Sequence, residues 1–86
     1  MSVLVNVNFT AAYLIETNLS RSDLRDANLY HANLSGADLS FADLRGAYLM
    51  NANLFGASLY YVGLTGADVS GAIMPDGTVM GSMSVL

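Results

Sequence analysis

Residues that could catalyse a reaction or bind a metal are few in this chain of 86 residues. His31 is the only histidine and there is no cysteine, so the chain lacks the further soft ligands that a zinc site with His31 would need. A solvated turn residue is the simpler interpretation of His31. We expect no bound metal and no cofactor.

Hydroxyl and carboxylate groups are more numerous, and they follow a spacing in multiples of five. They are Ser20, Ser35, Ser40 and Ser70, and Asp23, Asp38, Asp43 and Asp68. No serine has a histidine and carboxylate partner in this pattern that would activate it as a nucleophile. A carboxylate beside a turn commonly bonds to the backbone, and the glycines lack the strand, loop and helix context of a phosphate-binding loop. We therefore expect no enzymatic activity.

The element that positions these groups is a five-residue repeat. A small residue, usually alanine, lies two positions before the large apolar residues of one column, with Val7 and Val62 as the two larger exceptions. The column comprises Leu4, Phe9, Leu14, Leu19, Leu24, Leu29, Leu34, Leu39, Leu44, Leu49, Leu54, Leu59, Leu64, Val69, Met74 and Val79. A spacing of five scatters residues around a helix and alternates them across a continuous strand. A short extended piece followed by a corner instead turns both the small and the large residue inward.

Stacking at twenty residues places like residues on like, which predicts a four-sided coil. It superimposes Arg25 on Arg45, Phe41 on Tyr61 and Gly36 on Gly56, whereas a spacing of fifteen mixes these types. Glycine recurs two positions after the large apolar residue, where a type II turn needs a positive φ. We expect tight corners at those glycines, including Gly81. At Arg21, His31, Phe41 and Tyr61 we expect looser corners with another turn type.

Several units, including Ala27-Asn28-Leu29, Ala37-Asp38-Leu39 and Ala52-Asn53-Leu54, resemble the pentapeptide repeat family. The resemblance covers the chain from Ser2 to about Gly81. It implies an all-β fold, a right-handed quadrilateral β-helix of about four coils. We assign residues 1–81 to this domain and residues 82–86 to an apolar tail that has left the register.

Composition restricts the environment and the class of partner. Apolar residues make up 53% of the chain, but the apolar runs are only a few residues long and the first residues lack the pattern of a signal peptide. We expect a cytoplasmic protein that does not bind a membrane. Three arginines and no lysine oppose seven acidic residues, giving a net charge of −4. This balance argues against direct nucleic-acid binding.

Two functional hypotheses remain. The preferred one is a non-enzymatic structural or protein–protein interaction module with an unidentified protein partner. Its candidate surface is formed by exposed aromatic and apolar residues, namely Phe41, Tyr60, Tyr61, Tyr30 and Met50. For these residues themselves, a stabilising ladder that needs no partner is favoured over a partner site.

The second hypothesis comes from the family resemblance, which includes proteins that mimic duplex DNA and bind DNA gyrase. Asp23 and Asp43 form the one clear acidic column, but Arg25 and Arg45 lie beside them. DNA as long as the rod expected here carries about 11 charges, at one per 1.7 Å. The mimic is therefore the alternative rather than the preferred function.

The ends of the rod need protection, because a terminal coil is paired on one side only. Proline in the turn Met74-Pro75-Asp76-Gly77 removes one backbone donor from the last coil. The apolar tail beyond it is expected either to cover the last coil or to pack on a second copy. The candidate self-association residues are Met80, Met83, Val85 and Leu86, and we expect a homo-oligomer formed through a terminal coil.

Overall fold

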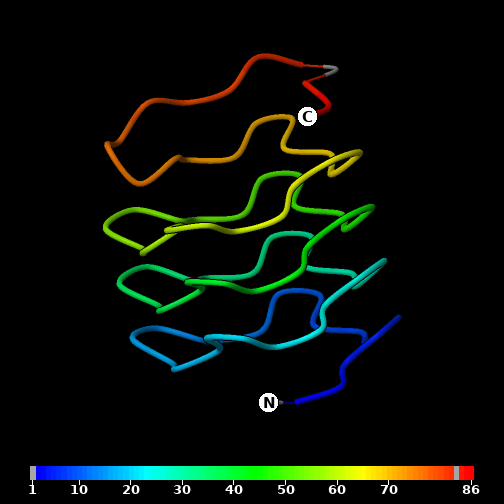
Figure 1. Cartoon of the computed structure of the whole chain (residues 1–86). Helices are drawn as coiled ribbons and strands as arrows, with labels where there is room; N and C mark the ends of the chain where they lie inside the picture. Colours follow the sequence, from blue (N-terminus) through cyan, green and yellow to red (C-terminus); the bar gives the residue numbers. More distant parts are fainter. Residues whose placement is uncertain (1, 83) are drawn as a thin grey trace.

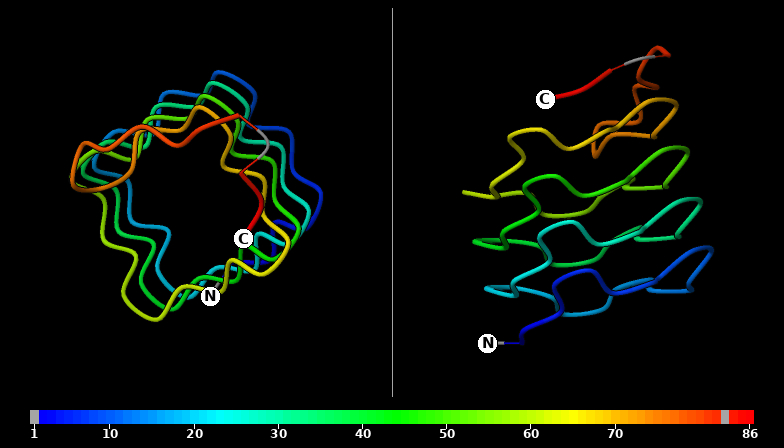
Figure 2. Two further views of the ribbon diagram at one scale, coloured as in Figure 1. Left: turned by 90° about the horizontal axis from the view of Figure 1, so that it is seen from above. Right: turned by 90° about the vertical axis from the view of Figure 1, so that its right-hand side faces the viewer.

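The computed structural model describes residues 2–82 and 84–86, and the chain winds repeatedly around one axis with its termini at opposite ends (Figure 1). Parallel bridges join each central residue to the one twenty positions later, as in Asp23 with Asp43 and Asn28 with Tyr48. Seen from above, the successive coils superimpose in a roughly four-sided outline (Figure 2). The predicted stacking period of twenty residues is therefore confirmed.

Regular secondary structure is minimal in the part of the chain that the structure describes, which contains no helix and no strand longer than one bridged residue. Each side of a coil holds one such residue, and a turn follows it. Two backbone hydrogen bonds join each side to the next coil, as when Leu24 N–H donates to Asp43 O at 2.8 Å and Asp43 N–H donates to Ser22 O at 2.9 Å. The side chain of the bridged residue, usually Asp or Asn, accepts from the backbone two positions later, which supports the turn.

The interior is filled by the two inward columns that the sequence predicts. The leucines from Leu24 to Leu54 are 0–1% exposed, and the alanines from Ala27 to Ala52 are equally enclosed. Leucine burial of this kind contributes about 1.5–3 kcal/mol per side chain. Towards the ends, Leu4, Phe9 and Leu64 are only partly buried. The core is therefore completed by stacking, and each terminal coil lacks one neighbour.

The corners share one geometry, so the expected difference between glycine and other corners is wrong. Phe41, at φ 59°, and Gly36, at φ 68°, both have positive φ at the third position of the turn. Both turns are closed by a backbone bond of 3.0 Å, from Ala42 N–H to Leu39 O and from Ala37 N–H to Leu34 O. The corner amides also donate to the next coil at 2.8 and 2.9 Å. Stacking therefore imposes one conformation on every corner, whatever its side chain.

The repeat ends in a reversal of the chain. Gly77 N–H donates to Met74 O at 2.8 Å, and Val79 then pairs antiparallel with Ile73. Val79 is consequently 67% exposed and not in the inward column, and Gly81 has no positive φ. These two expectations failed because the sequence register continues through a hairpin that the periodicity does not reveal.

The last residues fold back on the final coil. Val85 pairs antiparallel with Asp68, Val69 N–H donates to Ser84 O, and Leu86 N–H donates to Ala67 O, both at 2.9 Å. Of the two expectations for the tail, the structure shows the first, a tail that covers part of the last coil.

Candidate functional site

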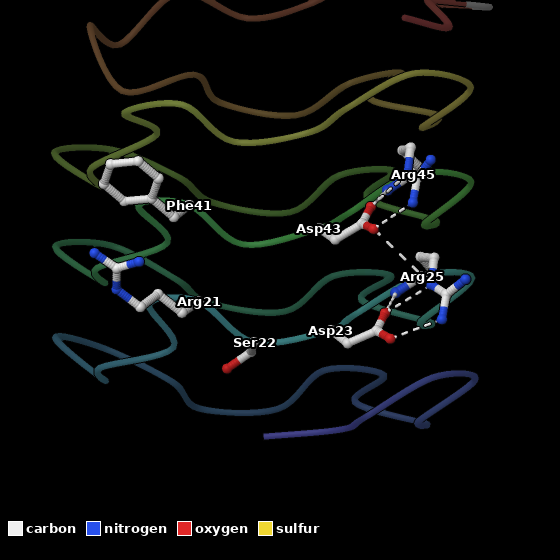
Figure 3. Close-up of a pocket in the computed structure, with 7 residues that line it drawn as sticks. All are labelled: Arg21, Ser22, Asp23, Arg25, Phe41, Asp43 and Arg45. Atoms are coloured by element: carbon white, nitrogen blue, oxygen red, sulfur yellow. Dashed lines mark hydrogen bonds and ion pairs between the residues drawn. The ribbon is translucent and has the colours of Figure 1, made fainter. Parts of the chain in front are cut away.

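One side of the rod carries an open surface pocket with a volume of about 620 Å³ (Figure 3). Its lining spans two neighbouring coils and consists of Arg21, Ser22, Asp23, Arg25, Phe41, Asp43 and Arg45. In Figure 3, Arg21 and Phe41 lie at one side of the pocket and the two Arg–Asp pairs at the other. We call this surface, together with Tyr60 and Tyr61 beside Phe41, the Arg–aromatic face.

The Arg–Asp pairs arise because an Asp-Leu-Arg unit is repeated twenty residues apart. Aspartate and arginine are two positions apart and point outward together, while the intervening leucine points inward. Arg25 donates from Nε to Asp23 Oδ1 at 2.9 Å and from Nη2 to Asp23 Oδ2 at 2.8 Å. The same two bonds from Arg45 to Asp43 measure 2.8 and 2.6 Å. Each aspartate is therefore held by a bidentate, charge-assisted contact.

These contacts neutralise the acidic column. The hydrogen bonds from Arg25 lower the pKa of Asp23, despite partial desolvation, and the bonds from Arg45 lower the pKa of Asp43 in the same way. Arg25 Nε also lies 3.9 Å from Asp43 Oδ2, which links the two coils. The arginine side chains remain 48% and 57% exposed, so their outer edges are accessible to a partner.

Three corner side chains form a vertical stack, with Phe41 between Arg21 and Tyr61. We call this stack the ladder column. The guanidinium carbon of Arg21 lies 4.6 Å from the ring centroid of Phe41. The rings of Phe41 and Tyr61 are nearly parallel, at 10°, with centroids 5.4 Å apart. Tyr60 meets both rings edge-on, at 5.7 and 4.6 Å. Stacked and edge-on pairs are both favourable aromatic geometries.

Charge is distributed unevenly over the molecule. All three arginines of the chain line the pocket together with two aspartates, leaving that surface one positive charge in excess. Of the other five carboxylates, Asp26 lies close enough to Arg25 to help raise its pKa, and the chain has no further arginine or lysine for the remaining four. Every arginine therefore lies on the Arg–aromatic face, which is close to neutral in an otherwise acidic protein.

The structure brings together Phe41, Tyr60 and Tyr61 as the sequence predicts. Tyr30 instead packs edge-on against His31, with centroids 4.2 Å apart, and Met50 is half-buried on that other side. Arg21 is the member that the sequence reasoning missed as a site residue. Stacking at twenty residues places Phe41 under Tyr61 and, in the same way, Arg21 under Phe41. This spacing is the signal that could have identified Arg21.

The C-terminal candidates for self-association differ in exposure. Met80 is half-buried and its amide donates to Ala72 O at 2.9 Å, whereas Val85 and Leu86 keep exposed side chains. Met83 lies outside the described residues. Within residues 2–82 and 84–86, no group of three His, Cys, Asp or Glu residues could hold a metal ion, and no helix is long and apolar enough to cross a membrane.

The repeat geometry agrees with a family model for pentapeptide repeats, which matches eight copies over residues 2–40 and 32–74. The chain belongs to the pentapeptide repeat family. No curated protein matches it. Among solved structures, this pentapeptide repeat chain is similar to HetL of the cyanobacterium Nostoc, a pentapeptide repeat protein involved in regulating heterocyst differentiation. The two are 37% identical with a TM-score of 0.53, and the match covers 84% of this chain and 42% of HetL.

A second similar structure is a pentapeptide repeat protein of the thylakoid lumen of Arabidopsis thaliana. It is 36% identical with a TM-score of 0.52, and the match covers 86% of this chain and 62% of the plant protein. This pentapeptide repeat chain therefore spans less than two thirds of the length of either protein. The likeness concerns the repeat scaffold that the three share.

Proposed function

We propose that this chain is a non-enzymatic protein-interaction module, a right-handed quadrilateral β-helix of about four coils that binds a protein partner through the Arg–aromatic face. The observation that carries the proposal is the concentration of every arginine, with the Phe41, Tyr60 and Tyr61 cluster, around one pocket. Arginine and tyrosine are enriched among residues that dominate binding energy at protein interfaces. Family membership and the likeness to HetL support a scaffold role.

The chemistry of the face indicates what the partner would present. Arg25 and Arg45 are each bound to an aspartate and remain about half exposed, so they can donate hydrogen bonds to a second carboxylate. Phe41 is 45% exposed and Tyr61 more so, which offers an apolar contact beside the charges. We expect an acidic segment with an adjacent aromatic or aliphatic side chain, because such a segment would match both halves of the pocket.

The alternative function, a DNA mimic that binds a topoisomerase, is less well supported. A mimic needs a series of free negative charges at the spacing of phosphates. Asp23 and Asp43 each receive two side-chain hydrogen bonds from arginine, so the acidic column offers no such series. Potent inhibition of DNA gyrase in a supercoiling assay would reverse this ranking.

The test compares two double variants in affinity capture from the native cell extract. Phe41→Ser with Tyr61→Ser removes the two stacked rings of the ladder column. Tyr48→Ser with Phe55→Ser, the matched control, removes two exposed rings outside the Arg–aromatic face. We expect the first variant to lose at least tenfold in partner recovery and the control to retain it. Retained capture by the first variant, or a loss that only follows its unfolding, would support a purely structural ladder.

A further inference from the structure

The side of the rod that carries the Arg–aromatic face has two edges of opposite character. This side, which we call the charged side, has one segment from each of three stacked coils, namely residues 21–26, 41–46 and 61–66. Its first edge is the ladder column, which carries a cation and two aromatic rings. Its second edge carries an anion and two corners without a side chain, namely Asp26, Gly46 and Gly66. The two edges are therefore complementary in charge and in shape at each coil.

The charged side chains at the two edges both extend towards the following coil. The guanidinium carbon of Arg21 lies 4.6 Å from the centre of the Phe41 ring. Asp26 Oδ1 occupies the space in which a side chain at Gly46 would begin. A Cβ added at Gly66 would meet only backbone atoms of Gly46, at 3.9 and 4.0 Å. The second edge thus presents its carboxylate at the level of Arg21 and leaves room for bulky groups above it.

Between the two edges, the charges also form opposite columns. Asp23 and Asp43 lie in one column, and Arg25 and Arg45 lie in the column beside it (Figure 3). Each arginine donates two hydrogen bonds to its own aspartate, and its side chain remains about half exposed. The guanidinium groups therefore keep N–H donors for a second carboxylate.

The net charge of the protein lies away from the charged side. The three arginines of this side are matched by its three aspartates, so it carries no formal net charge. The whole formal net charge of −4 comes from the other four carboxylates, which are Glu16, Asp38, Asp68 and Asp76. Two copies of the chain therefore bring the least like charge together when their charged sides meet.

We propose that the partner bound by the Arg–aromatic face is a second copy of this chain, packed side by side about a two-fold axis parallel to the rod. The proposal rests on the function proposed above, because it names the protein partner of the same surface. A second copy supplies the carboxylates and the aromatic rings expected of that partner. It also supplies arginines for the aspartates of the face, which an acidic segment alone would not.

A two-fold axis parallel to the rod keeps the coils level and exchanges the two edges. Arg21 then faces Asp26 of the second copy, and the rings of the ladder column face the glycine corners. In the middle, each arginine faces an aspartate of the second copy and donates to it through the N–H groups that its own aspartate leaves free. A two-fold axis across the rod would instead place each column against itself, with arginine near arginine. The charges therefore favour the parallel axis.

The size of the charged side agrees with a reversible dimer. The two shorter extents of the molecule are 23 and 22 Å, so one side covers about 500 Å² on each copy, or about 1,000 Å² in total. This area is near the lower limit for a specific interface. Dimerisation should therefore depend on protein concentration.

Exchanging charges between the two edges tests the proposal by sedimentation equilibrium. The native mass should rise with concentration from 9.1 kDa towards twice that value. Arg21→Asp alone sets aspartate against Asp26 of the second copy, and Asp26→Arg alone sets arginine against Arg21. We expect each variant to need at least tenfold higher concentration to dimerise. An equimolar mixture of the two should dimerise like the native chain, because opposite charges meet again at both edges.

Glu16→Arg is the matched control, because it changes the charge as Asp26→Arg does. Glu16 has φ 56° and Asp26 has φ 58°, and the Glu16 side chain lies at Gly36 as Asp26 lies at Gly46. Glu16 is outside the charged side, so this variant should dimerise at least as strongly as the native chain. Asp26→Arg makes the protein less negative to the same extent, so its weaker dimerisation would not come from net charge.

The proposal is overturned by a native mass of 9.1 kDa at every concentration, by either single variant dimerising like the native chain, or by a mixture no tighter than its components. NMR chemical shifts locate the contact on the native chain without a variant. The shifts that change with concentration should cluster in the charged side, and changes confined to other surfaces would contradict the proposal.

The same measurements separate this proposal from the proposed function. If the native chain stays monomeric and the Phe41→Ser, Tyr61→Ser variant loses a different captured protein, the proposed function stands. Only the second copy is then excluded as the partner.

Discussion

The ladder column and the glycine column, which we define as Gly36 and Gly56, share one backbone turn. The ladder column carries large side chains at this corner and the glycine column carries none. The φ angles are 60°, 59° and 53° along Arg21, Phe41 and Tyr61, and 68° and 71° along the two glycines. Every L-residue in this conformation costs about 1–2 kcal/mol relative to glycine. The fold therefore does not need large side chains at a corner. Where they occur, something must offset the cost.

Contacts within the ladder column supply part of that offset. An aromatic pair contributes about 0.5–1.5 kcal/mol and an exposed cation–π contact about 0.5–1 kcal/mol. Asn51 and Asp26 at other corners belong to residue types that tolerate positive φ, but Phe41 and Tyr61 do not. The same positive φ occurs at the corners Ala11 and Glu16, so it comes from the fold and does not by itself mark a functional site. The comparison therefore shows that the ladder column carries a conformational cost that its own stacking offsets in part.

Truncating the ladder gives the largest expected effect. Phe41→Ala removes two ring contacts and the contact with Arg21 but keeps the strained φ, so we expect the free energy of unfolding to fall by about 2 kcal/mol. Phe41→Gly loses the same contacts but relieves the strain. It should be about 1 kcal/mol more stable than Phe41→Ala, the reverse of the usual order. Urea unfolding of both variants measures the difference.

Ser35, which lies just before the corner at Gly36 and has no positive φ, provides the control. Ser35→Gly should be less stable than Ser35→Ala, in the ordinary order. If Phe41→Gly were also less stable than Phe41→Ala, the strain assigned to the ladder column would be wrong.

Building a ladder in the glycine column tests the comparison from the other side. Gly36→Phe introduces the left-handed cost, and its Cβ would lie 3.0 Å from Glu16 Cγ, so we expect a loss of about 1 kcal/mol. This corresponds to a fall in melting temperature of about 4–8 °C for a domain of this size. Gly56→Phe alone should cost a similar amount.

The double variant should lose less than the sum of the two single variants, because the introduced rings lie one coil apart and can stack. The expected coupling is about 0.5–1.5 kcal/mol in a double-mutant cycle. Strict additivity would show that stacking does not stabilise a column in this fold.

The smallest expected effect concerns the bridged residue that lies three positions before each corner. Before Phe41 this residue is Asp38, whose Oδ1 accepts from Ser40 N–H at 3.0 Å and from Ser40 Oγ at 2.6 Å. Before Gly36 it is Asn33. The Ser40 hydroxyl and amide lower the pKa of Asp38 below its ordinary 3.8. A lowered folded pKa stabilises the protein above the unfolded pKa, and this contribution is lost as the pH falls through the folded pKa. The melting temperature should therefore be constant above about pH 5 and fall below about pH 4.

Asp38→Asn separates this titration from that of the other carboxylates. Asn18, directly below Asp38 in the stack, makes the same two contacts with Ser20 at 3.0 and 2.6 Å, so asparagine fits the role. We expect the variant to match the native melting temperature at pH 7 and to show a smaller loss in acid. An unchanged acid profile would exclude Asp38 as a contributor.

Prediction from sequence succeeded where the repeat is strict. The inward positions of Leu24 to Leu54, the stacking of Phe41 on Tyr61 and the pairing period of twenty all follow from spacing, because residues at equal positions in equal units must occupy equal places. It failed at the corners Phe41 and Tyr61. Residue preferences predicted another turn type there, but stacking enforces the same turn as at the glycine corners. It failed again at Val79, where the spacing persists but the chain reverses.

Spacing and residue type thus determined the family, the four-sided coil, the buried leucine and alanine columns and the neighbourhood of Asp23 with Arg25. These features are local or periodic, so the order of the residues is enough to predict them. Only the tertiary structure decided that Arg21 lies on the Phe41 ring, that each arginine grips its aspartate with two bonds, and that the tail covers one end while the other stays open. Such features depend on side-chain rotamers and on the last neighbour of a stack, for which a repeating sequence has no repeated signal.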